Sequence, residues 1–131
     1  MRQIPDTCLW IGHRGDANDI PSLHKQEIQA VVDLADNEPC LILPREFIYL
    51  RFPLMDGKGN PAWLVQMICS TVKELVQHNI SVLVCCSAGM SRSPFVAAHV
   101  LASSHGISLG EALEQIRKTG PLDIQNGLFN Q

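Results

Sequence analysis

The chain has 131 residues, of which 46% are hydrophobic, and a formal net charge of −3 from 10 Lys+Arg and 13 Asp+Glu. This length and composition predict one globular domain that spans residues 1–131. The slight negative charge excludes the basic footprint of a nucleic-acid binder, so we expect no nucleic-acid partner. No apolar stretch approaches the roughly 18 residues that a membrane span requires, so we expect no membrane partner.

Apolar segments and turn signals alternate along the whole chain, which predicts interleaved strands and helices. In the first half, we expect strands at residues 8–11, 28–35 and 47–53. Residues 13–22 read as a loop in which Pro21 and Ser22 open a short helical turn, and residues 36–39 (DNEP) read as a turn. The segment 55–61 (MDGKGNP) is predicted to be an irregular loop because glycine, asparagine and proline crowd into it.

The second half begins with a predicted helix over residues 62–78, whose apolar residues share one face and which Asn79 ends in a left-handed conformation. Residues 80–85 (ISVLVC) are continuously apolar, as in a strand at the centre of a sheet covered on both faces. A helix from about residue 93 ends at Gly106. A last helix covers 108–120, with Ser108 and Glu111 at capping-box spacing, and residues 121–131 form an irregular tail.

The N-terminal residues, MRQIPDTCLW, lack the apolar core of a signal peptide, so we expect a cytoplasmic protein. The cysteines are five in number and lack the CxxC spacing of zinc sites, which predicts free thiols in a reducing compartment. The histidines are scattered without ligand spacing, and we expect no metal and no cofactor. The cysteines are Cys8, Cys40, Cys69, Cys85 and Cys86, and the histidines are His13, His24, His78, His99 and His105.

The loop after the strand at 80–85 carries the predicted chemistry. In an open α/β sheet, ligands bind beyond the carboxyl ends of the strands, where this loop lies. Residues 87–91 are uncharged, so their backbone N–H groups can converge on one anion, with the dipole of the next helix behind them. The predicted phosphate-binding residues are Ser87, Ala88, Gly89, Met90, Ser91 and Arg92.

Cys86 and Arg92 complete this predicted phosphate site. The planar guanidinium of Arg92 can bind two phosphate oxygens. Cys86 lies at the base of the loop, where the same positive field stabilises the thiolate over the thiol and makes the sulfur a nucleophile.

Phosphoryl transfer also needs a proton for the leaving oxygen, and Asp56 is the predicted donor. It lies in the only glycine-rich loop that directly follows a strand, so it can reach over the phosphate site. Asp-Gly is also common turn chemistry. Asp6, Asp16 and Asp19 are alternative acids, which we assign to surface or capping positions.

The stretch CSAGMSRSP resembles the signature loop of the cysteine-dependent protein phosphatases, in their compact dual-specificity branch, where Cys-x-Ala-Gly-x-Ser-Arg-Ser is typical. LWIG, YLRFPLMD and the closing IRKTGPLDIQNGLFNQ resemble further segments of that family. The resemblance implies a single-domain α/β fold of the protein-tyrosine-phosphatase type, with a central, mostly parallel (mixed) sheet flanked by helices. It implies Cys86 as nucleophile, Arg92 as phosphate ligand, Asp56 as general acid and later base, and Ser93 as the residue that eases departure of the thiolate.

Two positions depart from the family pattern. The family usually has histidine before the nucleophile, and here that residue is Cys85, whose thiol is a weak hydrogen-bond donor. Gly120 precedes Pro121 where many relatives carry arginine. The first departure bears on catalytic efficiency and the second on packing of the tail.

The implied reaction is hydrolysis of phosphotyrosine, and also of phosphoserine or phosphothreonine, in a phosphorylated protein substrate through a cysteinyl-phosphate intermediate. Relatives that act on inositol lipids tend to carry Lys or Arg inside the loop, whereas this loop has none before Arg92. The chain also lacks room for the extra loop that deepens strictly tyrosine-specific pockets. We expect a monomer.

Three other interpretations stay open. A non-catalytic phosphate-binding module of the same fold is suggested by Cys85. A rhodanese-type sulfurtransferase also has a cysteine at a strand end, but its loop usually holds one residue fewer before the arginine. A redox role, in which Cys85 or another thiol traps oxidised Cys86, follows from the ready oxidation of acidic thiols.

Overall fold

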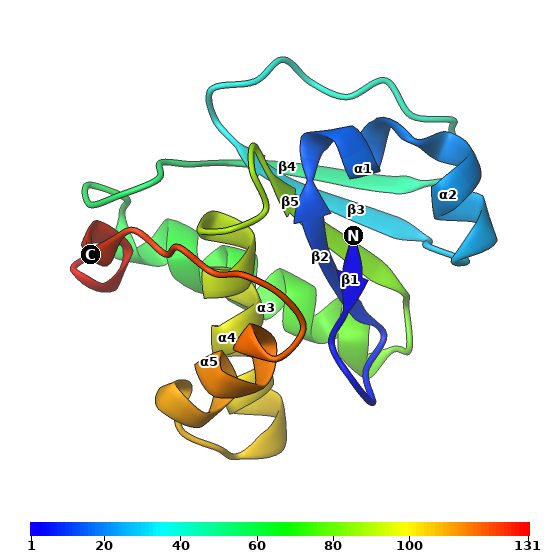
Figure 1. Cartoon of the computed structure of the whole chain (residues 1–131). Helices are drawn as coiled ribbons and strands as arrows, with labels where there is room; N and C mark the ends of the chain where they lie inside the picture. The colour runs from blue at the N-terminus through cyan, green and yellow to red at the C-terminus, as the bar shows by residue number, and fades with distance from the viewer.

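A five-stranded sheet runs between two groups of helices in the computed structural model, which describes residues 1–131 (Figure 1). The strands are β1 (Arg2–Gln3), β2 (Leu9–His13), β3 (Ala30–Ala35), β4 (Ile48–Leu54) and β5 (Val82–Cys86). Their order in the sheet is β1-β2-β5-β3-β4, and only β1 is antiparallel to its neighbour. The predicted mostly parallel, mixed sheet is therefore confirmed.

The helices cover both faces of this sheet. They are α1 (Arg14–Asn18), α2 (Ile20–Lys25), α3 (Ala62–Gln77), α4 (Arg92–His105), α5 (Leu109–Arg117) and the short 3-10 helix η1 (Asn126–Phe129). Helices α3, α4 and α5 lie on one side, and α1 and α2 lie on the other (Figure 1). None of the helices is both long and apolar enough to span a bilayer.

Strand β5 occupies the centre of the sheet, as its continuous apolar sequence predicts. It pairs in parallel with β2 on one edge and β3 on the other, and all its residues are buried. Side chains that alternate along a strand point to opposite faces of the sheet. Cys86 accordingly belongs to the larger apolar core beneath α3 and α4, whereas Cys85 belongs to the smaller core beneath α1 and α2.

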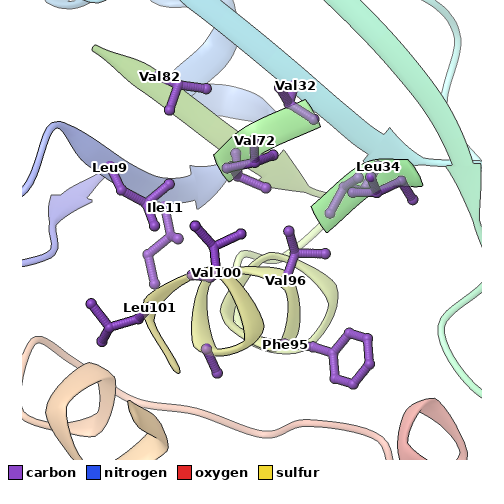
Figure 2. Close-up of a cluster of buried hydrophobic side chains, with 14 of the residues drawn as sticks. Leu9, Ile11, Val32, Leu34, Val72, Val82, Phe95, Val96, Val100 and Leu101 are labelled. Carbon is purple, nitrogen blue, oxygen red and sulfur yellow. The ribbon is translucent and has the colours of Figure 1, made fainter. Parts of the chain in front are cut away.

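The larger core fixes α4, the helix that follows the predicted phosphate loop. Figure 2 shows Val96 and Val100 of α4 facing Ile11 of β2 and Val72 of α3. All four side chains are at most 2% exposed. Close packing on the sheet therefore holds the start of α4 at the carboxyl end of β5.

Most helix ends agree with the predictions. Asn79 has φ 58° just after α3, and Gly106 has φ 65° as the C-cap of α4. The Ser108 side chain accepts a hydrogen bond from the Glu111 backbone N–H at the start of α5. These left-handed and capping residues end or begin their helices for the reasons that the sequence indicates.

The prediction for residues 13–22 is wrong in part. A helix, α1, replaces the predicted loop, whereas the short helical turn expected at Pro21 and Ser22 is confirmed as part of α2. The His13 ring accepts from the Asp16 N–H, and the Asp16 carboxylate accepts from the His13 N–H, so the two residues form a capping box for α1. Asp19 caps α2, because its carboxylate accepts hydrogen bonds from the backbone N–H and from the hydroxyl of Ser22. The two-residue strand β1 was not predicted either, and so short a segment carries no periodic pattern.

Candidate active site

Cys86 is the last residue of β5 and lies at the base of a loop that leads directly into α4. The residue is only 2% exposed. The backbone N–H of Gly89 donates to Cys86 Sγ over 3.2 Å. The strand therefore delivers the sulfur to the inside of the loop, where a donor already points at it.

Gly89 gives this loop its tight curvature. It has φ 74°, and a Cβ atom at this position would lie 2.8 Å from the carbonyl carbon of Gly12 at the end of β2. Only glycine tolerates both the left-handed conformation and such a close approach of two backbones. The sequence predicts Gly89 in the loop, but its contact with β2 follows only from the tertiary structure.

The loop presents several unpaired backbone donors. The N–H groups of Ser87, Ala88, Met90 and Ser91 donate to no acceptor within the chain. Helix α4 begins directly behind them at Arg92, so the positive end of its dipole faces the same place. Together these groups suit a bound oxyanion.

A cavity of about 210 Å³ lies in front of these donors. The residues that line it come from three segments: the loop after β4, the stretch from the end of β5 to the start of α4, and the tail. They are Asp56, Cys86, Ser87, Ala88, Met90, Ser91, Arg92, Asp123 and Gln125. The structure therefore brings Cys86, Arg92 and Asp56 around one cavity.

The Arg92 side chain is held in one orientation at the wall of this cavity. Its Nη1 donates to Leu54 O at 3.0 Å and to Asp36 Oδ1 at 2.9 Å, and its Nη2 donates to Ser87 Oγ at 3.1 Å. Its Nε is buried and has no hydrogen-bond partner. A buried donor without an acceptor costs about 1–3 kcal/mol, and an anionic oxygen in the cavity would satisfy it.

Asp56 lies in the exposed loop that follows β4, as predicted. Its Oδ1 accepts a hydrogen bond from Ser91 Oγ over 2.5 Å, so the carboxyl group is connected to the loop after Cys86. The alternative acids lie elsewhere. Asp16 and Asp19 cap α1 and α2, and Asp6 lies in the turn before β2, at the opposite end of the parallel strands.

Ser93 is fully buried near the start of α4. Its hydroxyl donates to Gly12 O over 3.4 Å and makes no hydrogen bond to Cys86. The structure thus brings Ser93 close to the loop but directs its hydroxyl toward the end of β2.

Cys85 takes no part in the cavity. Its side chain is fully buried in the core beneath α1 and α2 and makes no hydrogen bond to the loop. Burial raises the pKa of the Cys85 thiol, and the negative charge of Asp33 raises it further. Cys85 therefore remains a neutral thiol at physiological pH and does not replace the contacts of a histidine at this position.

Three residues of the site, Asp36, Asn37 and Glu38, were missed at the end of β3. Asp36 and Asn37 bond Arg92, and Asn37 and Glu38 accept from the Ser87 hydroxyl. The sequence predicts only a turn for these residues. The rule that ligand sites form at the carboxyl ends of parallel strands would have found them, because they directly follow a strand that pairs with β5.

Arg2 explains why residue 120 is glycine, because its side chain fills the space that a larger residue would need. A Cβ at Gly120 would lie 2.7 Å from Arg2 Nη1, and Arg2 Nη2 donates to Pro121 O over 2.9 Å. An arginine from β1 therefore occupies the space beside the start of the tail.

Comparison with known proteins identifies the family of this chain. The family model described as Dual specificity phosphatase, catalytic domain, matches residues 9–129. Human Dual specificity protein phosphatase 15 is 27% identical over 124 residues, which cover 94% of this chain and 41% of that protein. The chain thus spans less than half the length of this curated relative.

Solved structures show the same fold. The structure of human DUSP28 superposes with a TM-score of 0.87 at 20% identity, over 99% of this chain and 91% of that chain. A mouse putative dual specificity phosphatase complexed with zinc tungstate gives a TM-score of 0.85 at 24% identity, over 98% of this chain and 81% of that chain. Because the family model covers nearly all of the sequence, this protein belongs to the dual specificity phosphatase catalytic-domain family.

Proposed function

We propose that residues 1–131 act as one catalytic domain that hydrolyses phosphotyrosine, and also phosphoserine or phosphothreonine, in phosphorylated proteins. One observation carries this proposal: a single cavity is lined by the Cys86 sulfur, by Asp56, and by Arg92, whose buried Nε has no partner. A nucleophile, an anion-binding group and a proton donor are the three parts that cysteine-based phosphoryl transfer requires.

In the first step, the loop N–H groups and Arg92 hold the non-bridging phosphate oxygens. Cys86 Sγ attacks phosphorus, and a P–S bond forms while the P–O bond to the leaving group breaks. Asp56 transfers its proton to the leaving oxygen, so a neutral phenol or alcohol departs. The product of this step is cysteinyl phosphate and an ionised Asp56.

In the second step, water attacks the phosphorus of the cysteinyl phosphate. Asp56 takes a proton from this water, the P–S bond breaks, and inorganic phosphate and the Cys86 thiolate are formed. We assign to Ser93 the stabilisation of the departing thiolate. This role requires its hydroxyl to turn away from Gly12 O, which it contacts in the structure.

The charges around the cavity favour a single phosphate monoester. Arg92 is the only cationic residue in its lining, and Asp56 and Asp123 add two carboxylates. A polyanionic head group would meet repulsion from these carboxylates without further cations to bind it. A phosphorylated side chain of a protein carries only one phosphate, which Arg92 and the loop N–H groups can bind.

A second function, phosphate binding without catalysis, is favoured by the position of Cys85. Cys85 stands where the family usually has histidine, and its thiol makes no hydrogen bond to the loop that follows Cys86. Against this alternative, binding alone needs neither the thiol of Cys86 nor an acid at position 56. We therefore rank catalysis first.

The test is turnover of para-nitrophenyl phosphate and of a phosphotyrosine peptide by wild type and Cys86→Ser. We expect wild-type turnover of both and a loss of at least about a thousandfold in the variant, because no other group replaces the nucleophile. Cys40→Ser is the matched control, since Cys40 is exposed and lies outside the cavity.

Each alternative predicts a different result. Tungstate binding without turnover by wild type would support the binding module. Transfer of sulfur from thiosulfate would support a sulfurtransferase. Hydrolysis of a lipid or sugar phosphate without action on phosphopeptides would overturn the proposed substrate class.

A further inference from the structure

The tail, residues 121–131, contacts the loop that carries Asp56. The carboxamide of Gln131 bonds this loop twice: its Oε1 accepts from the Asn60 N–H at 2.6 Å, and its Nε2 donates to Gly57 O at 2.7 Å. The two backbones also pack closely, since a Cβ at Gly127 would lie 2.5 Å from the Lys58 nitrogen. The tail therefore holds the backbone of the loop immediately after Asp56.

The same tail contacts the loop that follows Cys86. The N–H of Asp123 donates to Met90 O at 2.8 Å, and the N–H of Gln125 donates to Ser91 Oγ at 3.0 Å. The Ser91 hydroxyl carries one hydrogen, which it directs to Asp56 Oδ1 at 2.5 Å. A chain of hydrogen bonds thus runs from the tail through Ser91 to the carboxyl group of Asp56.

The tail is itself anchored to the core, so it can hold the loop that carries Asp56 in a fixed position. Leu128 is 1% exposed and belongs to the larger core, and the Phe129 ring packs edge-on against Phe95 of α4 with 5.4 Å between ring centroids. Phe95 is 2% exposed. The segment that bonds the Asp56 loop is therefore anchored to the helix that starts at the phosphate-binding loop.

We propose that this tail positions the general acid, with Gln131 holding the loop backbone and with Ser91 and Gln125 orienting the Asp56 carboxyl group. This inference rests on the proposed function. Because Oδ1 accepts the Ser91 hydrogen, the acidic proton is carried by Oδ2, the oxygen without that bond. Gln131, Gln125 and Ser91 are positioning residues, since they act through Asp56 and not on the substrate.

Proton donation matters in proportion to the basicity of the leaving group. Phenyl phosphate releases a phenol that resembles tyrosine, whose pKa is about 10, and it needs the acid. Para-nitrophenyl phosphate releases a phenolate stabilised by its nitro group, which leaves without a proton. A misplaced acid therefore slows the first substrate more than the second, whereas a smaller folded fraction slows both equally.

The experiment compares kcat/KM for these two substrates in wild type, Gln131→Ala and Asn130→Ala. This constant reports on formation of the cysteinyl phosphate and not on its later hydrolysis, a step that both substrates share and in which Asp56 also takes part. A positioned acid contributes about 10²–10⁴-fold, so partial misplacement in Gln131→Ala should cost about tenfold on phenyl phosphate and less than about threefold on para-nitrophenyl phosphate. Asn130 is the matched control, because its side chain bonds only Asn126 O within the tail. In Asn130→Ala, the ratio of the rate constants for phenyl phosphate and para-nitrophenyl phosphate should equal that of wild type.

A second pair of variants tests the bond to Ser91. Gln125 has φ −64°, which suits proline, so Gln125→Pro removes the N–H donor without forcing a new φ. Gln125→Ala keeps the donor and is the matched control. We expect the rate ratio to shift in Gln125→Pro and to stay at the wild-type value in Gln125→Ala.

The outcomes separate this inference from the proposed function. Wild-type turnover with an equal loss on both substrates in Gln131→Ala, or with no loss on either, would overturn the positioning role alone. Failure of wild type to hydrolyse either substrate would overturn the proposed function and the role of the acid together. A selective loss on phenyl phosphate supports both.

Discussion

The guanidinium of Arg92 is paired on its outer side with Asp36, whose Oδ1 lies 2.9 Å from Nη1. Nη1 also donates to Leu54 O at 3.0 Å, so the orientation of the arginine does not depend on the carboxylate alone. The Asp36 side chain is 33% exposed, and its charge offsets part of the positive charge that a phosphate would meet. We therefore expect Asp36 to oppose anion binding more than it orients Arg92.

Because Asp36 reduces the positive charge beside the cavity, we predict that Asp36→Asn binds oxyanions more tightly than wild type. The amide keeps an oxygen acceptor for Nη1 and removes one negative charge near the cavity. Removal of a charge near a dianion in a partly solvated site is worth about 1 kcal/mol, or about a fivefold gain in affinity. Titration calorimetry with tungstate at fixed ionic strength measures the change.

The control is Asp6→Asn, which makes the same charge change in the turn before β2 and should leave the affinity for tungstate unchanged. Weaker binding by Asp36→Asn would show that the charge of the carboxylate, and not only its oxygen, is needed to hold Arg92.

Gly89→Ala should damage both the loop and the fold. An alanine in the left-handed conformation costs about 1–2 kcal/mol, and the clash of its Cβ with the Gly12 backbone adds to this cost. We expect the free energy of unfolding to fall by about 2 kcal/mol or more and tungstate binding to be lost. Urea unfolding and calorimetry give the two quantities.

Gly106→Ala provides the comparison for this variant. Gly106 has a similar positive φ of 65°, but a Cβ there has open space around it. It should cost only about 1 kcal/mol and leave tungstate binding intact. Equal damage by the two substitutions would mean that the contact between Gly89 and Gly12 has no special role.

Because two cysteine thiols are buried, we expect the free energy of unfolding to fall at alkaline pH. Burial raises the pKa of Cys69 in α3 from an ordinary value of 9.0 to about 11, and it raises the pKa of Cys85 as well. Their contribution to stability is complete below the pKa of the unfolded thiol and is lost as the pH rises through the folded value. The free energy of unfolding should therefore fall between about pH 9 and pH 11, with a slope of up to about 1.4 kcal/mol per pH unit for each thiol.

Urea unfolding of wild type and Cys69→Ala from about pH 7 to pH 10.5 tests this dependence. The decline should be shallower in Cys69→Ala, because one proton fewer is released on unfolding. Val72→Ala removes buried apolar atoms from the same helix without a titratable group, so its curve should be lower than that of wild type but parallel to it. Parallel curves for all three proteins would refute the assignment to Cys69.

Oxidation should not join Cys85 to Cys86. The two side chains lie in different cores on opposite faces of the sheet, and sulfurs that point apart cannot bond without movement of the backbone. After mild peroxide, we expect Cys86 as a sulfenic acid that dimedone traps. Peptide mapping without reduction checks this, and Cys85→Ala should oxidise at Cys86 at the wild-type rate. A peptide containing a Cys85–Cys86 disulfide would contradict the strand geometry.

The conformation of the loop after Cys86 could be predicted because its determinants are local. The apolar run before Cys86, the uncharged loop and the Pro94 that opens a helix specify a strand, a loop and a helix within about 20 consecutive residues. The structure adds what only tertiary contact can supply. The approach of Gly12 to Gly89 and the pairing of Asp36 with Arg92 join residues more than 50 positions apart, for which no periodic pattern exists.

The N-terminal helices α1 and α2 show a different reason why a prediction from sequence fails. Residues 14–25 are rich in polar and turn-forming types, and their propensities favour a loop. The helices form because His13, Asp16 and Asp19 supply caps and because Ala17 and Leu23 are buried against the sheet. Tertiary burial therefore overrides local propensity in this region.

Strand β5 is hydrogen-bonded along both edges and buried throughout, whereas the loop that carries Asp56 is mostly exposed. Amides of such a central strand exchange with solvent only when the whole molecule unfolds, whereas an exposed loop opens at much lower free energy. Mild denaturant should therefore release Asp56, the proposed proton donor, first. If the proposed function holds, molecules in that partly open state would still bind an oxyanion but would no longer hydrolyse a phosphate ester. Heat or urea would then abolish catalysis before it abolishes anion binding.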